Sequence, residues 1–589
     1  MTTTTESSLR QRIEATATPL AMLRRAAAAH PDKAAIEFLH SPFDPDPRVL
    51  SYRELLDEAE ATCRALHAAG VRRGDGIGML LPPIPEAIVT LIAAMEVGVV
   101  IPLNMLLSAD AIAAQLRLAR AKVVIVLGPH AQILVRQQLQ QAAQSVPTLE
   151  RIVEVSVEET SEDSVRWDRF LADHRNGRPV PEASADPHRA TALFHSGGTT
   201  GAPKLAELSE RNVVAGALMA AAAIGWRSDD RILLPFPMFH VAGAIDGALG
   251  SIAAGATVIL PTLLGGRHPQ LIPNIWKVVE HTRASVVALV PTSLIAAAEV
   301  PVGDCRLQHL RAIGTGSAPL LPATAARIER ILGKPIVQVY GMTETSGITA
   351  SQPVDGVFRE PAVGVPAPLM ELRLDLSHAA AAGRGEVCVR GPNVFTGYRT
   401  ESGTVSVLRD GWLPSGDLGE LDADGQLRLC GRSKDVIIRG GHNVDPLMIE
   451  DVANSHPDVV QSVAVAMPDG YAGEVPTLFV IVRAGASTTS DAIARFVAER
   501  IAEPPARPKL VTIIAEMPLT PIGKIARFKL RQAAAVRCAQ EALAALPIAA
   551  VDCSDIAAKR MQLSWHSHAT AAERELASKR LESLGLTAA

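Results

Sequence analysis

The stretch His195–Lys204 reads HSGGTTGAPK and directly follows a short apolar run, Thr191–Phe194, which predicts a strand. Glycines leave the backbone free to turn its N–H groups toward an anion, and hydroxyl and ammonium groups add further donors. The stretch is not a Walker loop, because Ala202 and Pro203 stand between its last glycine and the lysine. A glycine- and threonine-rich segment alone is more often a plain turn, but this order of residues, ending in Pro-Lys, favours a polyphosphate site. The candidate contacts are Ser196, Gly197, Gly198, Thr199, Thr200, Gly201 and Lys204.

Outward from this loop, helical and strand signals alternate. Toward the N-terminus the sequence predicts helices over Pro19–Ala29, Tyr52–Ala69 and Pro85–Val97, with strands over Ala34–Phe38, Gly76–Leu81 and Val123–Leu127. Toward the C-terminus, strands are predicted over Thr257–Leu260, Val286–Leu289 and Ile336–Tyr340. Strands separated by helices of this length are typical of parallel α/β layers.

The rest of the chain has a different character. From about Gly385 short strands with turn glycines predict a small β-rich subdomain, and a break follows Arg432. We therefore expect a disordered lead-in over 1–16 and a large N-terminal domain of layered α/β subdomains over 17–432. A small, mobile α+β domain over 433–530 would follow, and then an Ala-rich, helical extension over 531–589.

Composition limits the function classes. The 589 residues carry 57 basic and 62 acidic side chains, and aromatic residues make up only 3%, so a nucleic-acid binder with basic patches and stacked aromatics is disfavoured. The six cysteines are scattered without a Cys-x-x-Cys pair, which argues against a zinc ribbon or a disulfide scaffold and fits a reducing compartment. The polar N-terminus lacks the apolar stretch of a secretory signal, and no apolar run is long enough to span a bilayer. The sequence thus predicts a cytoplasmic protein without a transmembrane segment.

Once the phosphate loop is set beside seven further segments, a family resemblance becomes visible. The segments are Leu234–Gly243, Gly314–Leu320, Val339–Gly347, Gly385–Tyr398, Trp412–Gly419, Gly431–Glu450 and Pro518–Arg527. In order and spacing they are similar to those of the adenylate-forming superfamily, which includes acyl-CoA synthetases, luciferases and peptide-synthetase adenylation domains. The resemblance covers roughly Thr18 to Leu530. It implies an enzyme, an AMP-forming acid–thiol ligase, that uses ATP, Mg²⁺ and coenzyme A.

The resemblance also implies roles for individual residues in the first half-reaction, in which a carboxylate attacks the α-phosphorus of ATP and releases pyrophosphate. Lys524 would be the catalytic lysine, Thr343 would contact the α-phosphate, and Glu344 would bind the metal. Asp417 would accept both ribose hydroxyls, with Arg432 as a second ribose or phosphate contact. The adenine ring would lie between Tyr340 and the segment Gly316, Ser317 and Ala318.

Further roles concern the second half-reaction, in which a thiol displaces AMP. Lys434 stands at the position of the family's hinge residue, about which the small domain rotates between the two half-reactions. Gly440 and Gly441 match the loop that approaches the pantetheine thiol.

The acid itself is the least determined part. The candidate pocket residues are His240, Ala242, Gly243 and Gly314. Members of the family that activate amino acids place an aspartate in this segment to hold the α-ammonium group. The corresponding stretch Phe239–Ala242 contains no carboxylate, so the resemblance disfavours an α-amino acid. Small, apolar residues favour a medium- or long-chain fatty acid, and an alicyclic or aromatic acid comes next. We expect a monomer or homodimer that binds small molecules.

Two departures from the family pattern keep alternatives open. Gly197 stands where many members carry serine, and Glu210 stands where the family usually has histidine, so that a negative charge could lie near the polyphosphate. One alternative is a ligase that loads a carrier protein, although the sequence contains no recognisable carrier domain. The other is a catalytically weak nucleotide-binding homologue that acts as a partner subunit. A serine hydrolase and a dinucleotide oxidoreductase are disfavoured, because the chain lacks Gly-x-Ser-x-Gly and Gly-x-Gly-x-x-Gly motifs in the required context.

Overall fold

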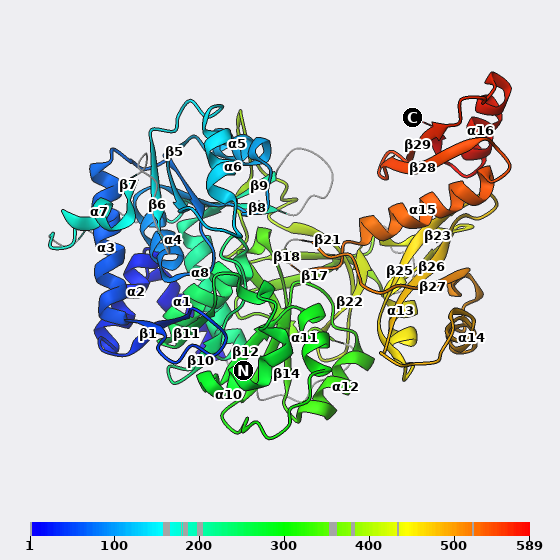
Figure 1. Cartoon of the computed structure of the whole chain (residues 1–589). Coiled ribbons are helices and arrows are strands. Elements are labelled where there is room, and N and C mark those ends of the chain that lie inside the picture. Colours follow the sequence, from blue (N-terminus) through cyan, green and yellow to red (C-terminus); the bar gives the residue numbers. More distant parts are fainter. Residues whose placement is uncertain are drawn as a thin grey trace.

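The computed structural model describes residues 3–156, 165–177, 180, 186–196, 204–352, 362–377, 383–432, 435–520 and 523–588. Its fold is mixed α/β, with a large N-terminal domain and a smaller C-terminal domain that carries a further C-terminal unit (Figure 1). The interpretation of the sequence as a large α/β domain followed by a small α+β domain therefore holds for the fold class.

Two nine-stranded sheets form most of the large domain. Both are parallel at their centres and antiparallel at one or both edges. In spatial order the first sheet contains β16 (Val365–Pro366), β15 (Gly347–Ser351), β14 (Ile336–Met342), β13 (Ala312–Gly316), β12 (Val286–Leu289), β10 (Arg231–Leu233), β11 (Thr257–Pro261), β1 (Ala34–Leu39) and β2 (Arg48–Ser51). The second contains β20 (Gly403–Val405), β19 (Gly397–Thr400), β9 (Lys204–Ser209), β8 (Ala190–Ser196), β4 (Val99–Pro102), β3 (Gly76–Leu80), β5 (Ala121–Leu127), β6 (Arg151–Val155) and β7 (Val165–Arg166).

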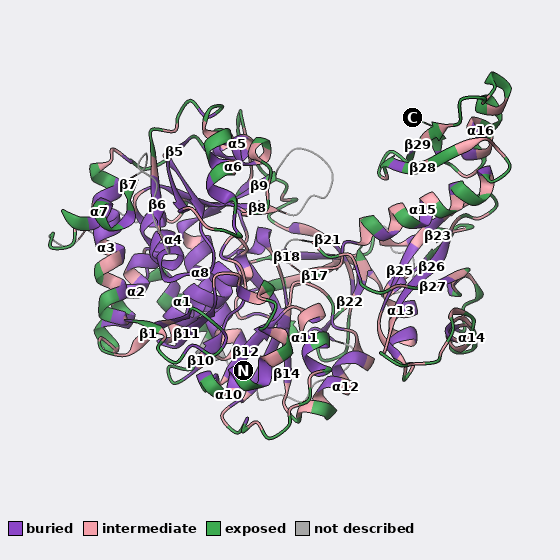
Figure 2. Ribbon diagram, viewed as in Figure 1, coloured by how far each residue is buried: buried purple, intermediate pink, exposed green. Residues whose placement is uncertain are grey.

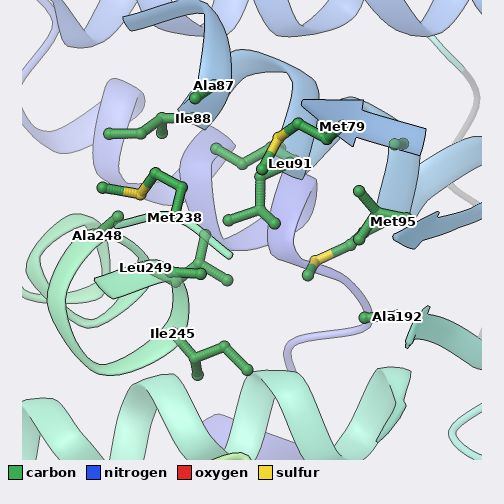
Figure 3. Packing of buried hydrophobic residues seen from close by; sticks show 14 of the residues in the cluster. Met79, Ala87, Ile88, Leu91, Met95, Ala192, Met238, Ile245, Ala248 and Leu249 are labelled. Carbon is green, nitrogen blue, oxygen red and sulfur yellow. The ribbon is translucent and has the colours of Figure 1, made fainter. Parts of the chain in front are cut away.

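Helix α4 (Pro85–Val97) lies between these sheets, in contact with β3 and β8 of one and β1 of the other. Residues from Pro85 to Glu96 are all buried, so the helix has no polar face, as a helix covered on every side requires. Ile88 and Leu91 of this helix pack in the cluster that also contains Ile245 and Leu249 from a helix near the site (Figure 3). The core thus connects the sheets to the π-helix over Ala242–Leu249, one of the elements that line the cavity described below. Buried residues are concentrated inside the large domain (Figure 2).

The large domain contains further helices. They are α1 (Thr3–Glu14), α2 (Pro19–Ala29), α3 (Tyr52–Ala68), α5 (Ala109–Leu118), α6 (Val135–Ala143), α7 (Trp167–Ala172), α8 (Glu210–Ile224), the π-helix η1 (Ala242–Leu249), α9 (Gly250–Ala254), α10 (Ile275–Thr282), α11 (Pro291–Ala298) and α12 (Pro322–Leu332), with short 3-10 turns η2 (Gly265–Arg267), η3 (Ile272–Asn274) and η4 (Thr343–Thr345). The predicted ranges of α2, α4 and β12 match the structure residue for residue.

The small β-rich subdomain is a four-stranded antiparallel sheet. It contains β17 (Glu371–Asp375), β18 (Gly385–Arg390), β21 (Leu413–Leu421) and β22 (Leu427–Arg432). The C-terminal domain follows with β23 (Ile437–Arg439), β24 (His442–Val444), α13 (Pro446–Asn454), β25 (Val459–Asp469), β26 (Gly473–Val482), α14 (Ser490–Arg500), η6 (Pro504–Ala506), β27 (Leu510–Ile513) and α15 (Arg527–Leu543).

Two expectations about the chain ends differ from the structure. Residues 3–14 form helix α1 rather than a disordered lead-in, because Leu9 and Ile13 bury their side chains in the main core. The C-terminal extension is not wholly helical: α16 (Ala571–Ser583) packs with a three-stranded sheet of β28 (Ile548–Asp555), β29 (Arg560–Trp565) and β30 (Thr587–Ala588). These elements and the end of α15 share a hydrophobic cluster of their own. The high alanine content suggested helix throughout the extension.

Candidate active site

An apolar cavity lies beside the carboxyl end of β13. Its walls include Gly314 and Gly316 of β13, Val339 of β14, and Trp226. Of the predicted pocket residues His240, Ala242 and Gly314 line the cavity, whereas Gly243 does not and lies against Pro237 instead. In open α/β sheets ligands bind outside the carboxyl ends of the strands, so the cavity lies where a substrate is expected.

The glycine loop begins and ends at residues that belong to one antiparallel pair. Ser196 of β8 lies opposite Lys204 of β9, while Gly197, Gly198, Thr199, Thr200 and Gly201 lie outside the described residues. The Lys204 ammonium lies 5.5 Å from the centre of the Tyr398 ring. The anchoring of both ends on paired strands fixes where the loop starts and returns.

Glu344 lies beside Ser196, at the start of this loop, and is buried. Its Oε1 accepts hydrogen bonds from the Ser196 hydroxyl and, at 2.6 Å, from the Tyr398 hydroxyl. Thr343, the neighbouring residue at the start of η4, is also buried. Burial and the carboxylate of Glu344 raise the pKa of Tyr398, so this phenol stays a hydrogen-bond donor at neutral pH.

The donor set fits Mg²⁺. Glu344 offers a hard carboxylate oxygen, and its Oε2 accepts no hydrogen bond from any described residue. Among the residues that the structure describes, no group of three His, Cys, Asp or Glu side chains could enclose a metal. An ion at Glu344 would therefore need oxygens from the phosphates as well, which is how Mg²⁺ is commonly bound in enzymes that use nucleoside triphosphates.

Asp417 is the centre of a second polar cluster. Its Oδ2 accepts a 2.7 Å hydrogen bond from the Tyr340 hydroxyl, and its Oδ1 accepts a 2.9 Å bond from Nε of Arg432. Burial, together with the charge of Asp417, holds the pKa of Tyr340 well above its usual value. Each carboxylate oxygen can accept a second hydrogen bond, so Asp417 keeps capacity for two hydroxyl donors. Tyr340, assigned to the adenine ring from the sequence, is thus tied to the residue assigned to the ribose.

Lys524 comes from the C-terminal domain and reaches the same region. It lies on a short turn in which the Thr520 N–H donates to the Lys524 carbonyl at 2.6 Å. Gly523 gives this turn a φ of +78°, which a side chain rarely adopts. The Thr292 hydroxyl of α11 donates to the Gly523 carbonyl at 2.7 Å and so joins the turn to the large domain.

The electrostatic environment of Lys524 comes from the residues above. Burial, reinforced by the positive charge of Arg432, lowers the pKa of Lys524 to about 8, while Asp417 and Glu344 oppose this shift. The structure therefore brings Lys524, Glu344, Asp417 and Arg432 within electrostatic reach of one another. Opposite charges assembled at such a site can hold an anionic substrate and respond to charge that develops on it.

His240 stands at the junction of this polar region and the cavity. Burial, with a further contribution from Lys524, lowers the pKa of His240 to about 3, so the ring is neutral at physiological pH. Its Nδ1 accepts a 3.3 Å hydrogen bond from the Ala242 N–H, which places the ring proton on Nε2. His240 therefore presents a neutral donor to the cavity that it lines.

The residues assigned to the nucleotide and the thiol occupy different places. Gly316 and Ser317 line the cavity, and Ser317 adopts a left-handed φ of +70°, a strained conformation of the kind found at binding sites. Ala318 follows and is half-buried. Gly440 and Gly441 form the exposed turn between β23 and β24 and do not line the cavity. Lys434 lies outside the described residues.

Glu210 lies away from the polar region. It is fully buried at the start of α8 and forms an ion pair with Arg189, whose Nε donates to it at 2.6 Å. The same guanidinium donates to the carbonyls of Met95 and Gly98. The negative charge of Glu210 is thus neutralised inside the large domain, and the concern raised by its place in the sequence does not apply to the phosphates.

Three residues at this site were not singled out from the sequence: Tyr398, Thr292 and Asp246, a cavity residue of η1. Tyr398 ends one of the family-like segments, and its proximity to the phosphate loop could have been suspected. Thr292 gave no signal, because the contact spans 231 residues of chain. Asp246 lies only six positions beyond His240, in a stretch judged by its small apolar residues.

This chain is similar to known proteins over most of its length. The AMP-binding enzyme family matches residues 23–399, and the AMP-binding enzyme C-terminal domain matches residues 448–524. The chain is 31% identical to marinolic acid–CoA ligase of Pseudoalteromonas sp. (strain SANK 73390) over 84% of its own length and 78% of that protein. It is 28% identical to a long-chain-fatty-acid–CoA ligase of Bacillus subtilis (strain 168) over 86% and 93% of the two chains.

Among solved structures, the anthranilate CoA ligase AuaEII in complex with anthranoyl-AMP superimposes with a TM-score of 0.78. That comparison has 25% sequence identity and covers 89% of this chain and 98% of the other. Family, relatives and fold agree with the clustered lysine, carboxylates and cavity, and the chain therefore belongs to the AMP-binding enzymes of the adenylate-forming superfamily.

Proposed function

We propose that this adenylate-forming enzyme couples the cleavage of ATP to the formation of an acyl-CoA thioester. The observation that supports this proposal most strongly is that Lys524 lies within electrostatic reach of Glu344 and Asp417, near an apolar cavity lined by His240. One domain supplies the carboxylates and the other supplies the lysine. Such a site can hold the phosphates of ATP beside the carboxylate of an acid, two anions that repel each other in water.

In the first half-reaction, an oxygen of the acid attacks the α-phosphorus and the bond to the pyrophosphate oxygen breaks. The Lys524 ammonium would lie between the two anions and compensate the negative charge that builds up between them. Thr343 would donate to the α-phosphate, and Asp417 would hold the ribose. Glu344 would hold Mg²⁺, which supplies charge neutralisation on the phosphates when bound.

In the second half-reaction, the thiol of coenzyme A attacks the carbonyl carbon of the acyl-adenylate and AMP leaves. Gly440 and Gly441 would lie along the pantetheine arm, and the open space around both residues is compatible with a close approach. They lie outside the cavity in this structure, so the small domain would have to rotate about Lys434 between the two steps. The electrostatic interaction of Lys524 with Asp417 and Glu344 supports our assignment of this arrangement to adenylate formation.

For the acid, we propose a medium- or long-chain fatty acid, with an alicyclic or aromatic acid as the alternative. The support is the apolar lining, which includes Ile224, Leu234 and Val339. Relatives of this chain act on acids as different as marinolic acid and long-chain fatty acids. The family alone therefore does not select among them.

We further propose a cytoplasmic location and a monomeric or homodimeric state. The six cysteines, all among the described residues, are present as free thiols, which agrees with a reducing compartment. No helix in the described part of the chain is long and apolar enough to cross a membrane.

The proposal is tested by measuring pyrophosphate release from MgATP with fatty acids of increasing length, benzoate and cyclohexanecarboxylate, with and without coenzyme A. We expect continuous turnover that requires coenzyme A and one class of acid. A single burst unaffected by coenzyme A would indicate a carrier protein as the acceptor. If ATP binds but no acid causes the release of pyrophosphate from it, the result would indicate the catalytically weak homologue and contradict the proposal.

A further inference from the structure

The cavity wall contains one acidic side chain. Asp246 lies in the π-helix η1, between residues that face opposite environments. Ile245, Ala248 and Leu249 pack into the main hydrophobic cluster (Figure 3), whereas Asp246 and Gly247 line the cavity. Asp246 is only 8% exposed. A π-helix is rare and often marks a functional site.

The carboxyl group of Asp246 has few partners. Its Oδ1 accepts one hydrogen bond, from the Ile348 N–H at 3.2 Å, and its Oδ2 accepts none from the residues that the structure describes. The Trp226 indole donates to the backbone carbonyl of Asp246 and not to its carboxylate. Asp246 forms no ion pair within the described part of the chain. Burial raises the pKa of Asp246 well above its usual value, and only the Ile348 N–H opposes this shift.

The backbone next to Asp246 is shaped to admit this carboxyl group. A Cβ at Gly347 would lie 2.1 Å from Oδ1 and 2.6 Å from Oδ2, closer than atoms can approach. Gly347 also has a φ of +109°, so glycine is required there on both counts. The chain therefore leaves room for a polar group in an apolar wall, where an aliphatic side chain would have satisfied packing.

A buried carboxyl group with one hydrogen bond is costly unless a ligand completes its hydrogen bonding. Leu234, Ile224 and Ala288 of the wall are apolar. The polar side chains that also line the cavity, those of His240, Thr315 and Ser317, donate no hydrogen bond to the Asp246 carboxyl group among the described contacts. A bound molecule that fills the cavity can supply the donor that completes the hydrogen bonding of Asp246. Lys524 contributes to the lowered pKa of His240, which also lines the cavity, whereas no charged group contributes to the shift at Asp246. Two polar groups with different electrostatic surroundings thus line the same cavity.

We propose that Asp246 is a specificity-determining residue that accepts a hydrogen bond from a hydroxyl or amino group on the acyl part of the substrate, away from its carboxylate. This inference rests on the proposed function and narrows the acid to one that carries such a donor. A site built to bind a donor discriminates strongly against an analogue that lacks it, because the buried acceptor is then left unpaired.

The test compares matched pairs of acids that differ only in the donor. Pyrophosphate release would be measured for octanoate against 6-, 7- and 8-hydroxyoctanoate and 8-aminooctanoate, and for benzoate against its hydroxy and amino derivatives. We expect kcat/KM to be about 10-fold or more higher for one donor-bearing member than for its plain partner. In Asp246→Ala this ratio should fall to near one or invert. The variant Ile224→Val, which changes the cavity without removing the carboxyl group, should keep it.

The variant Asp246→Asn separates charge from shape, because its amide oxygen can still accept from Ile348. With this variant, kcat/KM should fall more for the amino-substituted acids of the series than for the hydroxy-substituted acids. Equal or better turnover of plain acids by the wild-type chain, with an unchanged ratio in Asp246→Asn, would overturn the inference while leaving the ligase function intact.

Thermal protection of the wild-type protein by the same acids provides a second readout that requires neither turnover nor a folded variant. Greater protection by one donor-bearing acid than by its plain partner supports the inference, and equal protection overturns it. The absence of pyrophosphate release with every acid tested would contradict the proposed function instead. The protection data would still decide the role of Asp246.

Discussion

The protonation state of Lys524 should make the rate of adenylate formation depend on pH. The ammonium form is the one that can compensate charge between ATP and the acid, and the pKa of Lys524 in the unliganded protein is about 8. Because burial and the charge of Arg432 lower the pKa of Lys524 from its usual value, the ammonium group loses its proton as the pH rises through about 8. We predict that kcat/KM for adenylate formation falls above about pH 8, because this parameter reports the free enzyme. Lys524→Arg, which stays charged, should have lower activity but no such decline; an identical decline would assign the titration to another group.

Asp417 allows a second prediction about a single residue. Asp417→Asn keeps the size of the side chain but replaces one acceptor oxygen with an amide donor and leaves the Arg432 guanidinium without its charged partner. We expect ATP to bind at least about 10-fold more weakly, because hydrogen bonds to a charged group are lost. Isothermal titration with ATP measures this directly. An unchanged affinity would remove Asp417 from the nucleotide site, and Asp422→Asn, at an exposed turn, is the matched control.

Single residues also mark the limit of sequence-based prediction. Glu344, Asp417 and Lys524 could be predicted from the sequence because each stands in a short segment whose order of residues resembles that of the family. Tyr398 and Thr292 act through contacts that join distant parts of the chain, at separations of 54 and 231 residues, and nothing in their local sequence requires those contacts. Asp246 was available to inspection, but only the three-dimensional cavity shows that its side chain faces the substrate region. Glu210 was expected near the phosphates from its place in the sequence, and only the fold shows that it forms an ion pair with Arg189 instead.

At the scale of elements, the turn that carries Lys524 depends on its contact with α11. The Thr292 hydroxyl donates to the Gly523 carbonyl, and this bond spans the two domains. Thr292→Val keeps the shape of the side chain and removes the donor, which should cost about 1 kcal/mol. We predict that adenylate formation slows by about 5-fold while transfer from a preformed adenylate is unaffected.

Thr292→Ser is the matched control, because it retains the hydroxyl and should restore the rate of adenylate formation. Equal slowing of both half-reactions by Thr292→Val would show that the residue supports the fold rather than the position of the turn.

Elements were predictable to the extent that local pattern decides them. The buried run that forms β5 is rich in valine and isoleucine, and α4 is bounded by Pro85 at its start and Gly98 after its end. The C-terminal extension was judged by its alanine content, although β29 alternates strictly between exposed and covered positions, a strand pattern. Strand β28 does not alternate in this way, and both strands are held by a small cluster with α15 and α16 that only the packed chain reveals.

At the scale of the whole molecule, polar contacts hold the two domains in the orientation seen in Figure 1. Glu299 at the end of α11 forms ion pairs with Arg327 of α12 and with Arg483, which follows β26 of the small domain. Arg327 also donates to the Val459 carbonyl at 3.1 Å. These contacts would have to break if the small domain rotates between the half-reactions.

We therefore predict that Glu299→Gln weakens this orientation and slows adenylate formation by about 2- to 5-fold, since pairs that are one-third exposed contribute modestly. Transfer of the acyl group to coenzyme A should be unchanged or faster. Rapid-quench measurement of each half-reaction tests this, with Glu499→Gln on the exposed face of α14 as the control. Slowing of the transfer step alone would contradict the assignment of this orientation to adenylate formation.

The central claim is that Lys524 serves adenylate formation and leaves the site before thioester formation. The most direct measurement uses Lys524→Ala and compares pyrophosphate release from MgATP and acid with acyl transfer to coenzyme A from a chemically prepared acyl-adenylate. We predict that the first rate falls by about 100-fold or more, while the second stays within about 2-fold of the wild-type rate. Equal loss in both half-reactions would contradict the claim.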